Sequence, residues 1–215
     1  MNKRFCIFDM DGTLVDSMVY WQRLGREFLA DQGVTQNVDA VLERVKAMTI
    51  TESAALFMQE FGLSGTPESI GAAMNDVMEN HYRADIPLKP GVREYLDALH
   101  QAGAVLCVVS ATKKSLVEAC LRRLGVADDF AFFLSCEEVG AGKDRPDAYL
   151  EAAHRLGAAP SEIAVYEDAV FAAETAKAAR FYTVGVYDPC GETEWRRMTA
   201  LCDETIRDWR SATIS

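Results

Sequence analysis

The chain has 215 residues, with 22 Lys and Arg against 33 Asp and Glu, so its formal net charge is −11 with histidine neutral. Hydrophobic residues make up 49% and charged residues 26%, which is the composition of a folded globular protein and not of a disordered one. A surface this acidic repels phosphate backbones, so we expect no non-specific nucleic-acid binding. Binding of an anionic substrate would therefore need positive charge at the site to reverse the negative electrostatic potential locally.

The sequence gives no sign of export or of membrane insertion. The start, Met1 to Arg4, is basic, but the apolar run behind it ends at Asp9, too short for a signal peptide. No run approaches the roughly 18 apolar residues that a membrane span needs. The six cysteines form no C-x-x-C pair and no zinc-like spacing with the three histidines. We expect a cytoplasmic protein with reduced thiols and no membrane partner.

Five short apolar runs predict buried strands, at residues 5–8, 104–109, 132–134, 163–166 and 182–187. Continuous apolarity, without alternation, is typical of strands that are covered on both faces. Helical spacing of apolar residues separates most of these runs, at residues 91–101, 113–124, 147–156 and 169–179. The alternation predicts an α/β fold with a doubly wound, Rossmann-like parallel sheet. The tail from Gly191 onward is expected to add a short helix and one edge strand.

One long stretch interrupts this alternation. It contains only helix-like segments, around residues 19–31, 38–46, 51–61 and 68–82. We interpret it as an inserted α-helical cap domain, with Pro87 and Pro90 marking the return of the chain. The predicted domains are therefore an α/β core of residues 1–15 and 88–215, and a cap of residues 16–87.

Polar side chains capable of chemistry come directly after the predicted strands or in the loops that follow them. They are Asp9, Asp11, Ser110, Thr112, Lys143, Glu167 and Asp168. Ligands of doubly wound sheets bind outside the carboxyl ends of the strands, so these groups are expected to converge on one crevice.

The acidic residues of this set suit phosphoryl transfer. Asp9 and Asp11 are two residues apart, so in extended chain their carboxylates point the same way, and Gly12 permits a tight turn after them. One carboxylate can attack as a nucleophile while the second acid delivers and removes a proton. Carboxylates this close call for a cation, and Glu167 and Asp168 supply further hard oxygen ligands for Mg²⁺.

The remaining groups could hold a phosphate. Lys143 adds a positive charge that can balance a transferring phosphoryl group. Ser110, with the amides of Ala111 and Thr112 entering a helix, offers donors at a positive helix end. Each piece alone also has a plainer interpretation, as a turn, a helix cap or a solvated lysine. Their shared position at one side of the sheet favours a site.

Four segments resemble, in chain order, the four motifs of the haloacid dehalogenase superfamily. They read FDMDGTL from Phe8, VVSAT from Val108, GKDRPDAY from Gly142 and YEDAV from Tyr166. The resemblance spans nearly the whole chain, including the helical insertion, and is strongest to the β-phosphoglucomutase-like phosphatase branch. It implies a Mg²⁺-dependent phosphatase that works through an aspartyl-phosphate on a small phosphorylated metabolite, as a monomer or weak dimer.

The resemblance also implies residue roles. Asp9 would be the nucleophile and Asp11 the general acid and base. Mg²⁺ would be bound by acidic residues of the first and fourth motifs, namely Asp9, Asp11 through its backbone carbonyl, Asp168 and, as an additional ligand, Glu167. The phosphate would be held by Ser110, Ala111 and Lys143.

The cap distinguishes the reaction types that this resemblance leaves open. Sugar-phosphate mutases of the branch carry a cap-coupling histidine shortly after the acid/base aspartate and an arginine in a cap loop, where this chain has Trp21 and Ile50. A fixed cation for a second phosphate is missing, so we favour hydrolysis. A phosphohexomutase and a non-catalytic phosphate-binding relative remain the alternatives. Candidate substrate-facing residues in the cap are Trp21, Gln22, Lys46 and Arg83.

Three positions depart from the motifs. Asp144 replaces the first proline of the third motif, Ala169 a usual serine of the fourth, and Arg180 a usual helix-ending glycine. Loss of the serine removes a hydrogen bond that could support the metal-binding acids. The residues with implied chemical roles are all retained, so catalysis is expected to be less efficient but not lost.

Overall fold

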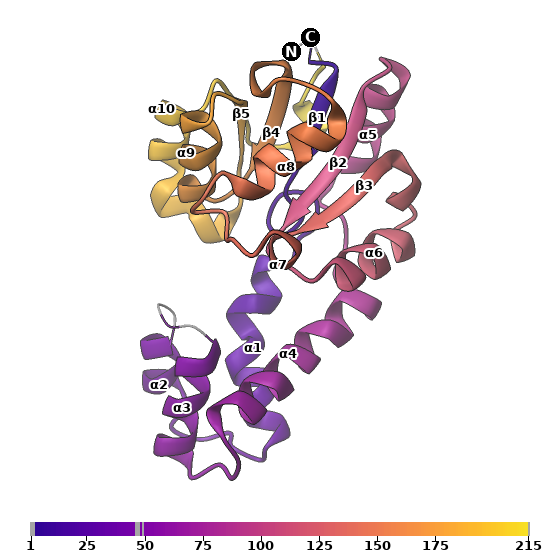
Figure 1. Ribbon diagram of the computed structural model, residues 1–215. Helices are drawn as coiled ribbons and strands as arrows, with labels where there is room; N and C mark the ends of the chain where they lie inside the picture. The colour runs from indigo at the N-terminus through magenta and orange to yellow at the C-terminus, as the bar shows by residue number, and fades with distance from the viewer. Residues whose placement is uncertain (1–2, 46–47, 49, 215) are drawn as a thin grey trace. The chain divides into compact units, whose positions relative to one another are not determined.

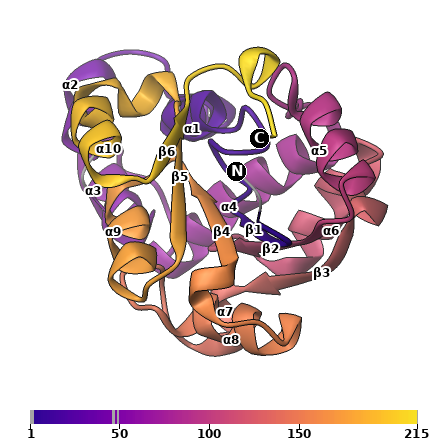
Figure 2. The same ribbon diagram turned by 90° about the horizontal axis from the view of Figure 1, so that it is seen from above.

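The computed structural model describes residues 3–45, 48 and 50–214. A six-stranded sheet has the order β3-β2-β1-β4-β5-β6, and every neighbouring pair is parallel (Figures 1 and 2). The strands are β1 (Phe5–Phe8), β2 (Val105–Ser110), β3 (Phe130–Ser135), β4 (Ile163–Glu167), β5 (Tyr182–Val186) and β6 (Glu204–Ile206). This is the doubly wound order, so the predicted α/β fold class is confirmed.

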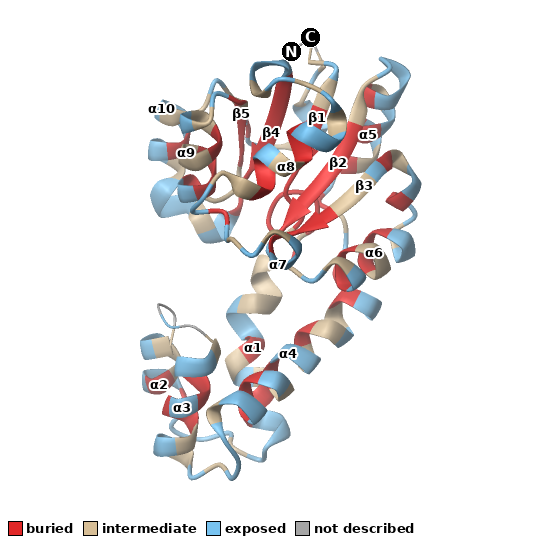
Figure 3. Cartoon of the chain, viewed as in Figure 1, coloured by how far each residue is buried: buried red, intermediate tan, exposed pale blue. Residues whose placement is uncertain are grey.

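Burial explains why these segments form strands. Every residue of β4 is buried, and in β1, β2 and β5 only the first residue is partly exposed (Figure 3). Strands covered on both faces need apolar side chains at successive positions, which is the pattern of the sequence. The edge strand β3 is less buried and begins at Phe130, two residues before the predicted start.

Helices cover both faces of the sheet (Figure 2). Those of the sheet-bearing part are α5 (Val92–Gln101), α6 (Lys114–Arg123), α7 (Cys136–Val139), α8 (Asp147–Leu156), α9 (Val170–Ala178) and α10 (Trp195–Leu201). Helices α8 and α9 bury alanines against one face, where Ile7 and Val165 point. On the opposite face, Tyr95 of α5 and Trp209 of the turn η4 (Trp209–Ser211) pack on Tyr166.

The short helix α7 was not predicted from the sequence. Ser135 at its start accepts a hydrogen bond from the amide of Glu137, and the Glu138 carboxylate accepts one from the Ser135 amide. Gly140 ends the helix in the left-handed conformation, with φ of 70°. Four residues are too few to show a helical period, so only this capping pattern could have indicated the helix.

The chain divides into two compact units, Met1–Met18 with Ile86–Ser215, and Val19–Asp85. The second unit is helical in its described residues, with α1 (Met18–Asp31), α2 (Asp39–Val45), α3 (Ile50–Phe61) and α4 (Pro67–Ala84). Its core includes Phe28 stacked on Phe57, with ring centroids 6.5 Å apart. That this unit serves as a cap is a proposal.

The limits of the second unit lie inside the predicted 16–87. The amide of Asp16 donates to the carbonyl of Pro87 at 3.0 Å, and Val15 forms an isolated antiparallel bridge with Leu88. The segments that lead into and out of the second unit are therefore hydrogen-bonded to each other within the sheet-bearing unit. None of the helices in the described ranges is long and apolar enough to span a bilayer. The six cysteines, which all lie within the described residues, form no disulfide with one another.

Candidate active site

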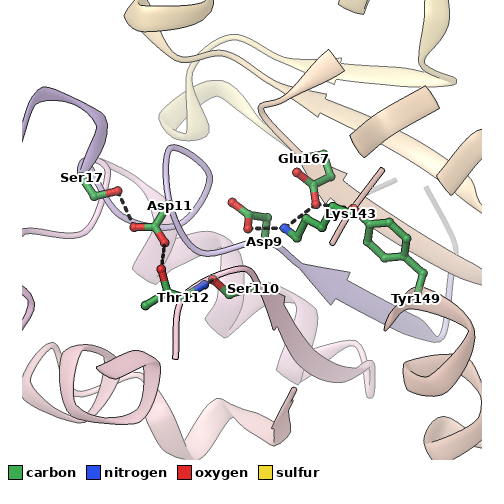
Figure 4. A network of polar contacts seen from close by, with 8 residues as sticks. All are labelled: Asp9, Asp11, Ser17, Ser110, Thr112, Lys143, Tyr149 and Glu167. Carbon is green, nitrogen blue, oxygen red and sulfur yellow. Dashed lines mark hydrogen bonds and ion pairs between the residues drawn. The ribbon is translucent and has the colours of Figure 1, made fainter. Parts of the chain in front are cut away.

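Asp9 lies directly after β1, at the carboxyl end of the sheet (Figure 4). Its amide donates to the carbonyl of Tyr166 on the neighbouring β4 at 3.0 Å, which fixes the backbone of the loop at its first residue. The residue is 6% exposed, and its Oδ1 accepts a hydrogen bond from the buried ammonium of Lys143. Burial raises the pKa of Asp9, and Lys143 opposes that shift.

Lys143 comes from the loop between α7 and α8 and is 7% exposed. Its Nζ contacts Asp9 and also donates to Oε1 of Glu167 at 2.6 Å (Figure 4). Burial lowers the pKa of Lys143, but the negative charges of Asp9 and Glu167 outweigh this effect and raise the pKa of the lysine above its ordinary range. The lysine therefore stays protonated and brings one fixed positive charge to the site.

The third group of the site is Glu167, the last residue of β4, with Asp168 following it. Asp9, Glu167 and Asp168 each offer a carboxylate oxygen, and these oxygens lie within 4.8 Å of one another. Burial, reinforced by the charge of Glu167, raises the pKa of Asp168 to about 7. Three carboxylates against one ammonium leave uncompensated negative charge in a buried place.

This donor set fits Mg²⁺, which prefers carboxylate oxygens and is attracted by such an excess of negative charge. The fit rests on the oxygen chemistry and the separation of the three acids. Gly12 contributes to it: its φ is +75°, and a Cβ there would overlap the Asp168 carboxylate. Only glycine allows the first and fourth motifs to approach this closely.

Asp11 does not belong to the group of three acids, and two hydroxyl groups bind its carboxylate (Figure 4). Ser17 Oγ donates to its Oδ1 at 2.7 Å, and Thr112 Oγ1 donates to its Oδ2 at 2.8 Å. Both carboxylate oxygens thus have donors, and the side chain has a defined orientation. The sequence did not indicate Ser17, which is fully buried and brought back to Asp11 by the turn at Gly12 to Val15.

The prediction that Ala111 and Thr112 enter a helix directly after Ser110 is wrong. Ser110 is the last residue of β2, and its Oγ accepts a hydrogen bond from the amide of Thr112 at 3.0 Å. Helix α6 begins only at Lys114, with Lys113 in the cap position and no side-chain cap. The serine satisfies a local turn, so Ala111 and Thr112 do not belong to the first helical turn. A phosphate-binding role of Ser110 and Ala111 stays a prediction.

Three of the four predicted substrate-facing residues lie in helices of the second unit. Trp21 Nε1 donates to the hydroxyl of the buried Tyr82 at 3.1 Å. Arg83 pairs with Glu79 one turn earlier on α4, at 2.7 Å, and Gln22 is exposed. Lys46 lies outside the described residues. The geometry within this unit does not assign any of them to a substrate.

The structure places all three residues that depart from the motifs. Ala169 occupies the N-cap of α9 in extended conformation and provides no side-chain hydrogen bond. Arg180 has a φ of 71°, in the left-handed region that a glycine would adopt without strain. Asp144 is exposed. No role was predicted for Tyr149, the last residue of the third motif, whose hydroxyl donates to Oε1 of Glu167 at 2.7 Å. Its place within that motif, soon after Lys143, was the available signal.

Acidic side chains and one lysine, gathered at the carboxyl ends of a doubly wound parallel sheet, define a Rossmann-like enzyme core with an acidic cluster that could hold a metal ion. The family model of the haloacid dehalogenase-like hydrolases matches residues 3–180. The chain belongs to this family of hydrolases, as its four motifs predicted.

Similar proteins cover most of the chain. Hexitol phosphatase B of Escherichia coli (strain K12) is 28% identical over 214 residues, covering 94% of each chain. Hexitol phosphatase A of the same organism is 30% identical over 186 residues, covering 85% of this chain and 82% of that protein. A crystal structure described as a putative beta-phosphoglucomutase from Thermotoga maritima has the same fold, with a TM-score of 0.81, 23% identity, and coverage of 96% of this chain and 95% of that one.

Proposed function

We propose that this hydrolase is a Mg²⁺-dependent phosphatase of small phosphate monoesters, which works through an aspartyl-phosphate on Asp9. The observation that carries the proposal is the arrangement around Asp9. Its carboxylate lies at the end of β1 against the Lys143 ammonium, within 4.8 Å of oxygens of Glu167 and Asp168, while Asp11 stands on the same loop. A nucleophile, a positive charge and an acid/base are thus available to one phosphate group.

In the first half-reaction, a carboxylate oxygen of Asp9 attacks the phosphorus atom of the substrate. The new O–P bond forms as the bond from phosphorus to the leaving oxygen breaks, and Asp11 donates a proton to that oxygen. The released alcohol carries the proton, and Asp11 is left as a carboxylate. Lys143 balances the negative charge around Asp9 and the transferring group.

In the second half-reaction, Asp11 removes a proton from water, and the water oxygen attacks the phosphorus of the aspartyl-phosphate. The Asp9 carboxylate leaves, inorganic phosphate is released, and Asp11 is again protonated. The hydroxyls of Ser17 and Thr112 give the Asp11 carboxylate a fixed orientation for both transfers. Bound Mg²⁺, held by Asp9, Glu167, Asp168 and the carbonyl of Asp11, would supply electrostatic stabilisation of the phosphoryl charge.

The residues at two positions of the second unit favour hydrolysis over a mutase reaction. Trp21 and Ile50 stand where the resemblance would place a histidine and an arginine in mutases, and neither side chain carries a positive charge. A second phosphate would therefore lack a fixed cation there. Relatives named as hexitol phosphatases, and a fructose-1-phosphate phosphatase from Escherichia coli, support phosphorylated hexitols and sugars as the first substrate class to test.

The proposal is tested by hydrolysis of p-nitrophenyl phosphate and of a panel of hexitol and sugar phosphates, with Mg²⁺ and then with EDTA. We expect activity in the first condition and none in the second. Asp9→Asn should abolish turnover on every substrate, and the exposed Asp144→Asn should not. Accumulation of a sugar bisphosphate, or its requirement for activity, would favour the mutase. No hydrolysis of any substrate with Mg²⁺ would favour the non-catalytic alternative.

Asp11→Asn gives a sharper test because its effect should differ between substrates whose leaving groups differ in their need for a proton. A p-nitrophenolate departs without protonation, whereas the alkoxide of a hexitol phosphate requires a proton. We therefore expect the variant to lose much more of the initial phosphoryl-transfer rate on hexitol phosphates than on p-nitrophenyl phosphate. An equal loss on both substrates would contradict the acid role of Asp11.

A further inference from the structure

Glu167 is held by two donors that reach it from the same loop-and-helix segment. Lys143 Nζ donates to Oε1 at 2.6 Å, and the hydroxyl of Tyr149 donates to the same oxygen at 2.7 Å (Figure 4). All three residues are buried. In the described part of the chain, both hydrogen bonds that this carboxylate accepts end on Oε1, which leaves Oε2 for a metal ion.

The two donors differ in how firmly they are placed. Lys143 carries its ammonium on a flexible four-carbon chain and already divides its hydrogen bonds between Asp9 and Glu167. Tyr149 projects from α8 into the core, is fully buried, and packs against Phe181 with ring centroids 6.1 Å apart. Its hydroxyl is the single polar atom of the side chain, so the packing of the ring determines where that donor lies.

We propose that Tyr149 is a positioning residue that fixes the Glu167 carboxylate for divalent-cation binding while Lys143 serves Asp9 and the phosphate. The inference rests on the proposed function, because it requires Glu167 to bind the metal. When Lys143 turns toward a phosphoryl group, Tyr149 remains as a donor to Oε1. The orientation of Glu167 is therefore independent of whether phosphate is bound.

Tyr149→Phe tests this role because it removes one oxygen atom and keeps the ring in the core. The probe is Mn²⁺, which shares the oxygen preference of Mg²⁺ and is followed by electron paramagnetic resonance. We expect the dissociation constant of the variant for Mn²⁺ to rise about tenfold, the lower end of the range for groups that support metal ligands. At saturating Mg²⁺ the turnover and the KM for p-nitrophenyl phosphate should return to within about threefold of wild type.

Tyr95→Phe is the matched control. Tyr95 is also a buried tyrosine, its hydroxyl forms a hydrogen bond with the hydroxyl of Tyr166 at 3.0 Å, and it lies on the other face of the sheet. Its Mn²⁺ affinity should stay within twofold of wild type. In a Glu167→Gln background, Tyr149→Phe should change Mn²⁺ affinity by less than twofold, because the group that it orients is no longer a carboxylate.

The outcomes separate this inference from the proposed function. Wild-type affinity for Mn²⁺ in Tyr149→Phe would overturn the positioning role and leave the phosphatase proposal standing. Failure of the wild-type protein itself to bind Mn²⁺ or Mg²⁺ would overturn both. If the phenylalanine variant does not fold, Tyr149→Met removes the same hydroxyl with a side chain that adapts to irregular gaps, and the same tenfold loss is expected.

Discussion

Replacing Asp168 by asparagine should stabilise the metal-free protein at alkaline pH. Asp168 is surrounded by Asp9 and Glu167, and its pKa rises from 3.8 to about 7 in the folded protein, because burial and the charge of Glu167 oppose its ionisation. Between these two values the folded state binds a proton that the unfolded state has released. Stability therefore falls as the pH rises from about 4 to about 7.

The size of the effect follows from that interval. A pKa shift of one unit is worth about 1.4 kcal/mol, so the rise in the pKa of Asp168 corresponds to a loss of about 4 kcal/mol in the free energy of unfolding at high pH. This value is the upper limit, reached only if the site does not relax when Asp168 ionises. Asparagine does not ionise, but its amide still has to be buried, so we expect a net gain of about 1–3 kcal/mol at pH 8. At pH 4, where Asp168 is protonated in the folded protein, the gain should be close to zero.

Urea denaturation in EDTA, at pH values from 4 to 8, measures this difference. The control is Asp144→Asn, which removes an exposed carboxylate and should leave the pH profile of wild type unchanged. Mg²⁺ at pH 8 should stabilise wild type much more than Asp168→Asn, because the variant lacks one ligand. An Asp168→Asn profile that falls with pH as steeply as the wild-type profile would refute the electrostatic reasoning.

Three further variants have defined expectations. Arg180→Gly should raise the free energy of unfolding by about 0.5–1 kcal/mol in denaturant titrations, because glycine relieves a left-handed φ of 71° at some cost in unfolded-state entropy; no gain would contradict that strain. Ala169→Ser should add about 1 kcal/mol by capping α9, measured by thermal unfolding, and an unchanged midpoint would show that no cap forms. Lys143→Met should lower turnover about 10²–10³-fold. It should also move the acid limb of the pH–rate profile to higher pH, because the pKa of Asp9 rises further when the positive charge of Lys143 is removed. An acid limb at the wild-type pH would contradict the pairing of Lys143 with Asp9.

The sequence predicted the sheet well because its strands are covered on both faces. Continuous apolar runs carry that information locally, and the doubly wound fold then places Asp9 and Asp168, which follow strands, at the same carboxyl edge of the sheet. The grouping of the acids followed from topology alone, with no knowledge of side-chain contacts.

The details that sequence could not supply depend on contacts between distant segments. Lys89 forms a buried ion pair with Asp188, 99 positions later, at 2.7 Å, and the hydroxyl of Tyr149 meets Glu167 only because of how α8 packs on the sheet. The error at Ser110 has a local cause. A serine after a strand can cap a helix or close a short turn, and the sequence around it does not decide between the two.

The central claim is that Asp9 accepts the phosphoryl group, and the most direct test is to identify the phosphorylated residue. Wild-type protein, quenched in acid during turnover with Mg²⁺ and a hexitol phosphate, should yield an Asp9-containing peptide heavier by one phosphoryl group and sensitive to hydroxylamine. Asp9→Asn should yield none. A phosphorylated peptide from any other part of the chain, or turnover by the asparagine variant at a rate near wild type, would contradict the account.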